Sequence, residues 1–275
     1  KSYVIGDGGE GTVEAFHETC QGKKQPVSTT DAYGKKIMSE YTIIDDGKTA
    51  VIEVANIIGL NMHEREKRAP FFGSSFGVGT VMLDAVANGC QKIIIGLGGS
   101  ATNDGGMGLL QALGCRFYDS SHKYLSPQAM NLDKVRYIDF NRLNRLEGIE
   151  LIAACDVKNH LLGENGATFV FGKQKGFFPN QIRKIDLGME NFRNQVRRYL
   201  KVDIDSFEGG GAAGGIGAVL IGILQARMIP GIELLLSFSD MEEQVRDCDL
   251  VITGEGQSDR QTMFGKVPVG ILKVA

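Results

Sequence analysis

The stretch VIGDGGEGTV, residues 4–13, places two carboxylates, Asp7 and Glu10, in a glycine-rich turn before a helical pattern. Its glycine spacing is that of a dinucleotide-binding turn, which holds a pyrophosphate at a helix N-terminus. A carboxylate about 4 Å from a phosphate charge costs ~1 kcal/mol in water and ~4 kcal/mol at an effective dielectric constant of about 20, whereas a helix dipole returns only ~0.3 to 1 kcal/mol. The two acids therefore favour a cation such as Mg²⁺ between them and phosphate, unless they only cap the helix that begins near Thr12.

The stretch GLGGSATNDGG, residues 96–106, combines five glycines with hydroxyl, amide and carboxylate side chains. Its backbone N–H groups at residues 98–101 are suited to cradle phosphate, and Asp104 is suited to bind Mg²⁺ or to accept a proton from an attacking hydroxyl. A tight turn alone needs fewer glycines and hydroxyls. The candidate phosphate-binding residues of this loop are Gly98, Gly99, Ser100, Thr102 and Asn103.

Two more glycine-rich loops follow apolar runs. In TGEGQSDRQT, residues 253–262, Glu255 and Asp259 come after a strand that reads as buried. The loop FEGGGAAGGIGAVL, residues 207–220, has only small side chains, which suit a close approach of the backbone to a ligand or of a helix to a sheet.

Other charged residues stand in the stretch AACDVKNHLLGENGATFVFGKQKG, residues 153–176, and in one strand. Asp156 at a strand end is a candidate metal ligand. Lys175, with Lys173 beside it, is suited to neutralise a phosphate or a substrate carboxylate, although exposed lysines are commonly only solvated. Glu53 lies within an apolar run, so it is either a buried site residue or an exposed strand position.

The elements that must position these residues repeat one pattern, in which a β-branched apolar run is followed by a glycine-rich loop and then a helix. This pattern predicts an α/β fold with a largely parallel, Rossmann- or flavodoxin-like sheet, and such sheets place ligands at the carboxyl ends of their strands. Residues 25–55 differ, because short strands joined by turns, with Asp46-Gly47 at a hairpin tip, predict an antiparallel part. Residues 180–200 predict a surface helix.

Composition excludes several classes of function. The chain of 275 residues has a net charge of −3 and no long basic run, which argues against nucleic acid and an anionic membrane as partners and favours small molecules. Its five scattered cysteines read as reduced residues of a cytosolic protein, and no apolar run approaches the ~20 residues that span a bilayer. The chain begins within a strand pattern and ends just inside a helical one, so we expect it to be part of a longer protein.

Motifs of P-loop enzymes, protein kinases, serine hydrolases and zincins are absent from the sequence. A dinucleotide-dependent oxidoreductase stays an alternative, although Asp31, the acid at about the distance that a ribose ligand requires, falls in a turn. A non-catalytic module that binds a nucleotide or an organic acid is a second alternative.

Taken together, six motifs resemble those of the bacterial type 1 glycerate kinase family, in the family's order and over nearly the whole chain. They are DGGEGTVEA, TAVIEVANIIGL, GLGGSATNDGGMGLLQALG, CDVKNHLLGENGATFVFGKQKG, GGGAAGGIGAVL and DLVITGEGQSDRQTMFGKVPVG. The family's opening and closing segments are not in this stretch. Arg68 aligns with an arginine of a further, looser family motif.

The resemblance implies ATP-dependent phosphorylation of D-glycerate, with 2-phosphoglycerate favoured as product, with Mg²⁺, in the cytoplasm. It implies two α/β domains, of which residues 1–58 with 241–275 belong to the first and residues 59–240 form the second, inserted one. We expect Asp104, Asp7 and Asp259 as catalytic acids, with Asp7 and Asp156 as metal ligands. We expect Arg68, Lys175 and Glu255 to bind substrate or phosphate. A homo-oligomer is compatible with the sequence.

Overall fold

The computed structural model describes residues 8–239, 241–246, 248–254 and 271–272. In this part, six strands form one sheet in the order β1-β2-β3-β4-β7-β8. The strands are β1 (Lys23–Thr30), β2 (Lys36–Ile44), β3 (Thr49–Glu53), β4 (Lys92–Gly96), β7 (Glu150–Ala154) and β8 (Arg227–Ile229). Strand β2 is antiparallel to both of its neighbours, β1 and β3, whereas β3, β4, β7 and β8 run parallel. The predicted α/β fold is confirmed, as is its antiparallel part, with Asp46-Gly47 in the β2–β3 turn.

Strand β4 shows why the centre of the sheet reads as a continuous apolar run. Side chains alternate between the two faces of a strand, and both faces of this sheet are covered. Ile93 and Ile95 belong to the core on one face, whereas Ile94 belongs to the core on the other. All three are fully buried.

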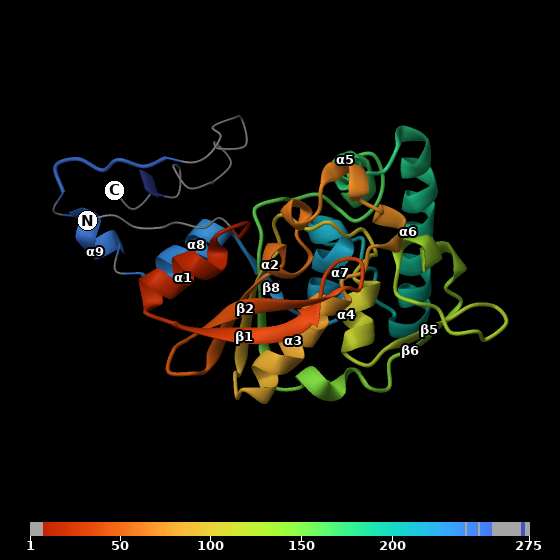
Figure 1. The fold of residues 1–275 in the computed structure, drawn as a ribbon, viewed down its shortest axis with the longest axis horizontal. Helices are drawn as coiled ribbons and strands as arrows, with labels where there is room; N and C mark the ends of the chain where they lie inside the picture. Colours follow the sequence, from red (N-terminus) through yellow and green to blue (C-terminus); the bar gives the residue numbers. More distant parts are fainter. Residues whose placement is uncertain (1–7, 240, 247, 255–270, 273–275) are drawn as a thin grey trace.

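Helices cover both faces. The helices α1 (Thr12–Cys20) and α8 (Gly231–Ser237) lie side by side on the Ile94 face (Figure 1), where Phe16 and Leu235 share one core cluster. The other face packs against α2 (Ala55–Ile58), α3 (Phe76–Ala87), α4 (Met107–Ala112) and α7 (Ile216–Gly222).

An outer group of elements packs on the second face. It contains α5 (Ala167–Lys175), α6 (Pro179–Leu200) and a two-stranded sheet of β5 (Arg116–Tyr118) and β6 (Tyr137–Asp139). The predicted surface helix at 180–200 is confirmed as α6, which buries one apolar face and has Pro179 in its first turn. The remaining elements are α9 (Met241–Arg246) and the 3₁₀ helices η1 (Leu60–Met62), η2 (Arg65–Lys67), η3 (Pro70–Phe72), η4 (Ala129–Lys134), η5 (Leu143–Leu146) and η6 (Ala212–Gly215).

The division into residues 1–58 with 241–275 and residues 59–240 stays a prediction. Strands β3 and β4 lie on either side of residue 58 in the sequence and pair directly, from Thr49 with Lys92 to Glu53 with Gly96.

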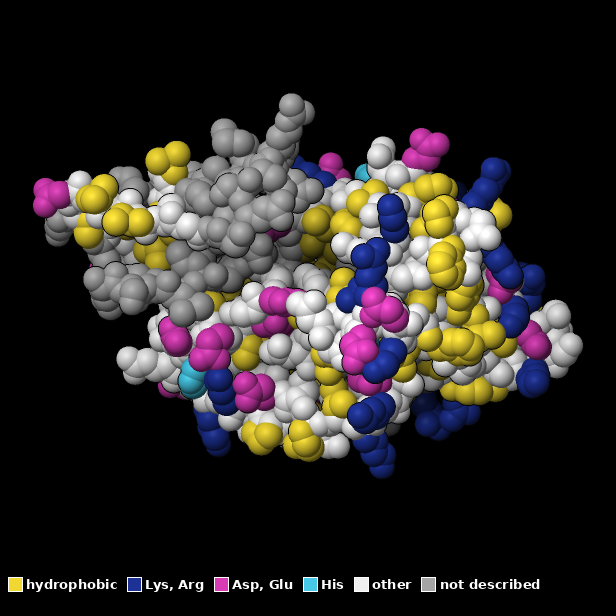
Figure 2. Space-filling model, turned by 45° about the horizontal axis from the view of Figure 1, so that its top comes forward, with side chains coloured by type: hydrophobic (Ala, Val, Ile, Leu, Met, Phe, Trp, Pro, Cys, Tyr) yellow, Lys and Arg dark blue, Asp and Glu magenta, His cyan; other side chains and the backbone are white. Residues whose placement is uncertain are grey.

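One apolar stretch of the described residues, Pro70–Ala87, has the length and hydropathy of a membrane-crossing helix. Half of it is buried inside the protein, and α3, its larger part, packs against α4 and β1. Its place in the core accounts for its apolar composition. On the face shown in Figure 2, the Lys and Arg side chains of the described residues are interspersed with Asp and Glu.

Candidate active site

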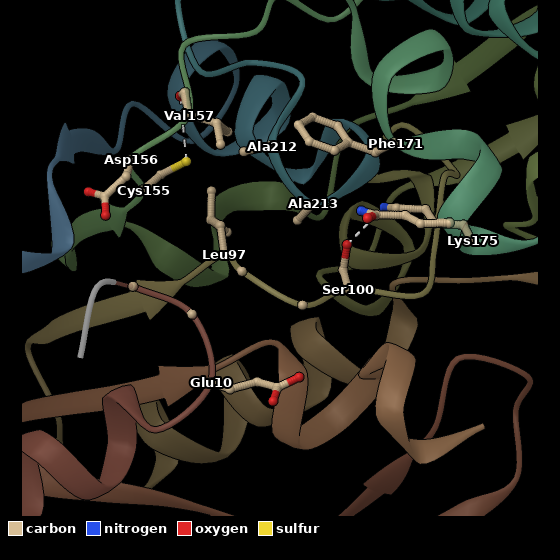
Figure 3. Close-up of a pocket in the computed structure, with 15 residues that line it drawn as sticks. Glu10, Leu97, Ser100, Cys155, Asp156, Val157, Phe171, Lys175, Ala212 and Ala213 are labelled. Carbon is tan, nitrogen blue, oxygen red and sulfur yellow. Dashed lines mark hydrogen bonds between the residues drawn. The ribbon is translucent and has the colours of Figure 1, made fainter. Parts of the chain in front are cut away.

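A cavity of about 470 Å³ lies at the carboxyl ends of β4 and β7 (Figure 3). Its wall comes from segments far apart in the sequence, namely the opening loop, the loop after β4, the segment after β7, helix α5 and η6. The lining residues are Gly8, Gly9, Glu10, Leu97, Gly98, Gly99, Ser100, Cys155, Asp156, Val157, Phe171, Gln174, Lys175, Ala212 and Ala213. The glycine-rich loops therefore meet where a parallel sheet places its ligands.

The opening loop and the loop after β4 touch through their backbones. The Gly98 N–H donates to the Gly8 carbonyl oxygen at 2.9 Å, and a Cβ atom on Gly98 would lie 2.4 Å from the Cα atom of Gly9. Gly8 has a φ of +87°, in the region that favours glycine. Glycine is thus needed on both sides of this contact.

The loop after β4 presents two backbone donors. An isolated bridge between Gly59 and Ser100 holds it, with Leu60 N–H donating to the Gly99 carbonyl oxygen at 2.8 Å. The N–H groups of Gly99 and Ser100 have no acceptor within the described part of the chain. Successive N–H groups of this kind form a concavity that binds anions.

Lys175, the last residue of α5, lies at the cavity wall and is only 2% exposed. Its Nζ donates to Ser100 Oγ at 2.9 Å and to the Thr102 carbonyl oxygen at 2.5 Å (Figure 3). Burial lowers the pKa of Lys175 to about 7, against a smaller opposing effect of the Asp104 charge. A positive charge is therefore expensive here without an anion, and an anion in the cavity would stabilise it.

Asp104 has a different environment from the one expected of a base. It is fully buried, does not line the cavity, and its carboxylate accepts hydrogen bonds from Ser75 N–H, Ser75 Oγ, Gly106 N–H and Gly108 N–H. Burial raises the pKa of Asp104, and these hydrogen bonds oppose that rise. The carboxylate ties the segment before α3 to the first turn of α4. Its role as base stays a prediction that this geometry does not support.

Thr102 and Asn103 also lie behind the cavity wall, with no exposed surface. Asn103 Nδ2 donates to Thr168 Oγ1 at 2.9 Å, at the start of α5. Within the described residues, Thr102 Oγ1 and Asn103 Oδ1 have no hydrogen-bond partner. Of the predicted phosphate-binding residues of this loop, Gly98, Gly99 and Ser100 reach the cavity.

Arg68 does not line the cavity. Its guanidinium donates to three carbonyl oxygens, those of His63 at 3.3 Å, Leu60 at 3.1 Å and Gln174 at 2.7 Å. These bonds join residues 60–68 to α5, which is a structural role. Its predicted contact with a substrate carboxylate has no support in this geometry.

The cap of α1 comes from Glu53 rather than from the opening loop. The Glu53 carboxylate is 2% exposed and accepts Gly11 N–H at 3.2 Å and Val13 N–H at 3.1 Å. Burial raises the pKa of Glu53, and the two N–H groups oppose this rise. Glu53 thus does not line this cavity and is not an exposed strand residue; it is a buried helix cap. Asp7, Glu255 and Asp259 lie outside the described residues.

Asp156 lines the cavity at the end of β7. Its Oδ1 accepts Gly231 N–H at 3.0 Å, at the first residue of α8. The same carboxylate therefore fixes α8 and faces the cavity.

Several lining residues were not predicted. Phe171 precedes Lys175 by four residues, so helical spacing from Lys175 would have placed it on the same face of α5. Ala212 and Ala213 belong to the small-residue loop, which also packs on the loop after β4, since Gly105 N–H donates to the Gly214 carbonyl oxygen at 2.9 Å. The loop thus lines the cavity and packs on another loop, and its predicted approach to a ligand stays a prediction.

Comparisons with known proteins agree with this architecture. The glycerate kinase family model matches residues 1–275. The glycerate kinase of Halalkalibacterium halodurans is 42% identical over 272 residues, which are 98% of this chain and 72% of that protein. The glycerate 2-kinase of Escherichia coli is 42% identical over 275 residues, which are 100% of this chain and 72% of that protein.

A crystal structure from Salmonella typhimurium LT2, provisionally named glycerate kinase 2, superposes with a TM-score of 0.89 at 40% identity, covering 98% of this chain and 72% of the other. The match of the family model over the whole chain and these relatives lead to one conclusion. This chain belongs to the glycerate kinase family.

Proposed function

We propose that this protein transfers the γ-phosphoryl group of ATP to D-glycerate and gives 2-phosphoglycerate. The observation that carries the proposal is the whole-chain similarity, at 40 to 42% identity, to proteins named glycerate kinase or glycerate 2-kinase. The cavity adds a chemical reason, because phosphoryl transfer depends on positioning and charge neutralisation more than on covalent catalysis.

In this proposal the phosphate groups are bound by Gly99, Ser100 and Lys175, whereas Gly98 lines the cavity and donates its N–H to Gly8. The N–H groups of Gly99 and Ser100 donate to phosphate oxygens. The ammonium group of Lys175 opposes the negative charge that develops on the transferred group. Ser100 and Lys175 are hydrogen-bonded at the cavity wall (Figure 3), and Gly98 and Gly99 line the same cavity.

Mg²⁺ is part of the proposal. Within the described residues, no group of three or more His, Cys, Asp or Glu side chains is arranged to hold a metal ion. Mg²⁺ bound to a nucleotide needs only one or two carboxylates together with phosphate oxygens, so Asp156 at the cavity wall fits it, with Asp7 as the second predicted ligand. Bound there, the ion would neutralise phosphate charge.

ATP and glycerate are the small-molecule partners in this proposal. The predictions of a cytoplasmic location, of a homo-oligomer, and of no nucleic-acid or membrane partner stay predictions.

The test measures ADP release by the purified protein with D-glycerate and MgATP. Enolase is added to identify the product, because it consumes 2-phosphoglycerate directly but 3-phosphoglycerate only after a mutase has acted. We expect glycerate-dependent ADP release and enolase turnover without the mutase. Stabilisation by NADH and not by ATP in a thermal shift would instead favour the oxidoreductase, and stabilisation by ATP without ADP release would favour the binding module.

The role of Lys175 has a matched control on the same helix. We expect Lys175→Met to lower kcat/KM by at least ~100-fold, because a charged hydrogen bond to phosphate is worth ~1.5 to 3 kcal/mol and transition-state charge adds to it. Lys173 is exposed, so Lys173→Met should leave kcat/KM unchanged. Equal losses of kcat/KM in both variants would contradict the proposed role of Lys175 in binding phosphate.

A further inference from the structure

Glu10 lies between two cavities. It lines the main cavity and also a second one of about 390 Å³, which is bounded by Glu53, Asn61 and Met62 among others. Figure 3 shows Glu10 on the side of the main cavity opposite Lys175. A group at such a junction reaches the contents of the main cavity and also has a route to solvent.

The carboxylate of Glu10 is not used to cap helix α1. The N-terminal N–H groups of that helix are bound by Glu53 instead. One oxygen of Glu10, Oε1, accepts a hydrogen bond from Asn61 Nδ2 at 2.6 Å. The other, Oε2, accepts none from the described residues, so it is available to a ligand.

Asn61 is itself fixed relative to the glycine-rich loop after β4. It lies in the middle of η1, and the preceding residue, Leu60, donates its N–H to the Gly99 carbonyl oxygen. The Leu60 carbonyl oxygen accepts from Arg68, which also binds α5. The bond from Asn61 therefore sets Glu10 in a fixed relation to the loop and helix that carry Ser100 and Lys175.

We propose that Asn61 is a positioning residue that holds Glu10 so that Glu10 Oε2 binds the hydroxyl of the acceptor and takes up its proton. The proposal rests on the function proposed above. In the step, the hydroxyl oxygen forms a bond to the γ-phosphorus, the bond from that phosphorus to the β,γ-bridging oxygen breaks, and ADP leaves. The hydroxyl proton moves to Glu10 and then to solvent through the second cavity.

Charge gives the acceptor its orientation. The second cavity has Glu10 and Glu53 on its wall and, within the described residues, no lysine, arginine or histidine. It therefore repels the carboxylate of a hydroxy acid and accepts its uncharged hydroxyl end. The acceptor carboxylate therefore stays outside the second cavity, and the hydroxyl end lies next to Glu10.

The test compares Asn61→Ala with Asn61→Gln, which keeps an amide donor, and with Glu10→Gln. We expect Asn61→Ala to lower kcat with D-glycerate about tenfold and Glu10→Gln to lower it at least 100-fold. The KM for MgATP and the ATP affinity measured by calorimetry should stay unchanged in both. Asn61→Gln should recover most of the lost kcat. The matched control is Asn180→Ala, an exposed asparagine at the start of α6, which should behave as wild type.

Two outcomes would overturn the proposal while leaving the glycerate kinase activity in place. One is wild-type kcat in Asn61→Ala. The other is a raised KM for MgATP in Glu10→Gln with an unchanged kcat, which would place Glu10 on the nucleotide side. If wild-type protein released no ADP with glycerate, the proposed function itself would fail, and the two failures are thus distinguishable. Circular dichroism checks that each variant is folded.

Discussion

Lys175 is the residue at which stability and function oppose each other. Its ammonium group is buried, and its pKa falls from 10.5 to about 7 because burial disfavours the charged form. Below pH about 7 the lysine is charged in both the folded and the unfolded chain, so the folded state bears the full cost of burying the charge. Between pH 7 and 10.5 the folded state gives up the proton first, and above 10.5 neither state is charged.

The free energy of unfolding of the wild type should therefore rise with pH across this window relative to that of Lys175→Met. The expected slope of the difference is at most about 1.4 kcal/mol per pH unit. Urea unfolding at pH 6.5, 8 and 9.5 measures it. Lys173→Met, at an exposed position, should show no slope against the wild type. A flat difference for Lys175→Met would mean that folding does not lower the pKa of Lys175.

Asp104 allows a structural role to be separated from a catalytic one. An asparagine there would turn its NH₂ group toward backbone donors such as Ser75 N–H and Gly108 N–H. We expect Asp104→Asn to lower the free energy of unfolding by about 2 to 4 kcal/mol, because buried donors lose their acceptor. Asp133→Asn, at an exposed position, should change it by less than ~0.5 kcal/mol.

Urea unfolding and kcat per folded molecule are both needed for Asp104→Asn. If Asp104 were the base, the variant would keep its stability and lose turnover. A loss of stability with turnover retained supports the buried tie between the segment before α3 and helix α4.

Sequence reasoning located the loops of the site but not the direction of every side chain in them. Gly98, Gly99 and Ser100 face the cavity, whereas Thr102 and Asp104, a few residues further, face the interior. The backbone has left-handed φ angles at residue 99, within the first group, and at residues 105 and 106, just after the second. The partners that fix the loop, such as Ser75 and Gly214, are distant in sequence. Loop composition alone therefore cannot assign its side chains to the wall or to the core.

At the scale of elements, helix α1 depends on a cap from a strand 40 residues away in the sequence, since Val13 N–H donates to Glu53 Oε2. In Glu53→Gln the NH₂ group would face one of the two helix N–H groups. We expect a loss of about 1 to 2 kcal/mol in the first turn of α1, and amide exchange at Val13 faster by about 5- to 30-fold.

Amide hydrogen exchange followed by NMR measures this effect residue by residue. Glu18→Gln, at an exposed position of the same helix, is the control and should leave the exchange of Val13 unchanged. Exchange that increased equally across α1 and the sheet would indicate global destabilisation, not the loss of a cap.

The elements themselves could be predicted where periodicity was strong. Strand β4 and helix α6 follow from an isoleucine run and from helical spacing, because burial on two faces or on one face leaves a local pattern. Strand β8 has only three residues, Arg227–Ile229, and none of them is fully buried. It is a strand because it pairs with β7. That pairing is a tertiary contact and leaves no pattern in the local sequence.

At the scale of the whole molecule, the question is whether residues before and after position 58 unfold together. Strand β3 pairs with β2 on one side and with β4 on the other, and Val51 and Ile94 are both fully buried. Because β3 and β4 pack on the same core on each of the two faces of the sheet, the sheet should open as one cooperative unit. We therefore expect the amides of Val51 and Ile94 to exchange with opening free energies equal within ~0.5 kcal/mol, and equal to the free energy of global unfolding in urea.

If the predicted boundary at residue 58 separated two independently stable units, Val51 would exchange through a partial opening that left Ile94 protected, and unfolding followed by circular dichroism would show two transitions. The two results are exclusive, because a single opening free energy shared by Val51 and Ile94 cannot coexist with two separate unfolding transitions.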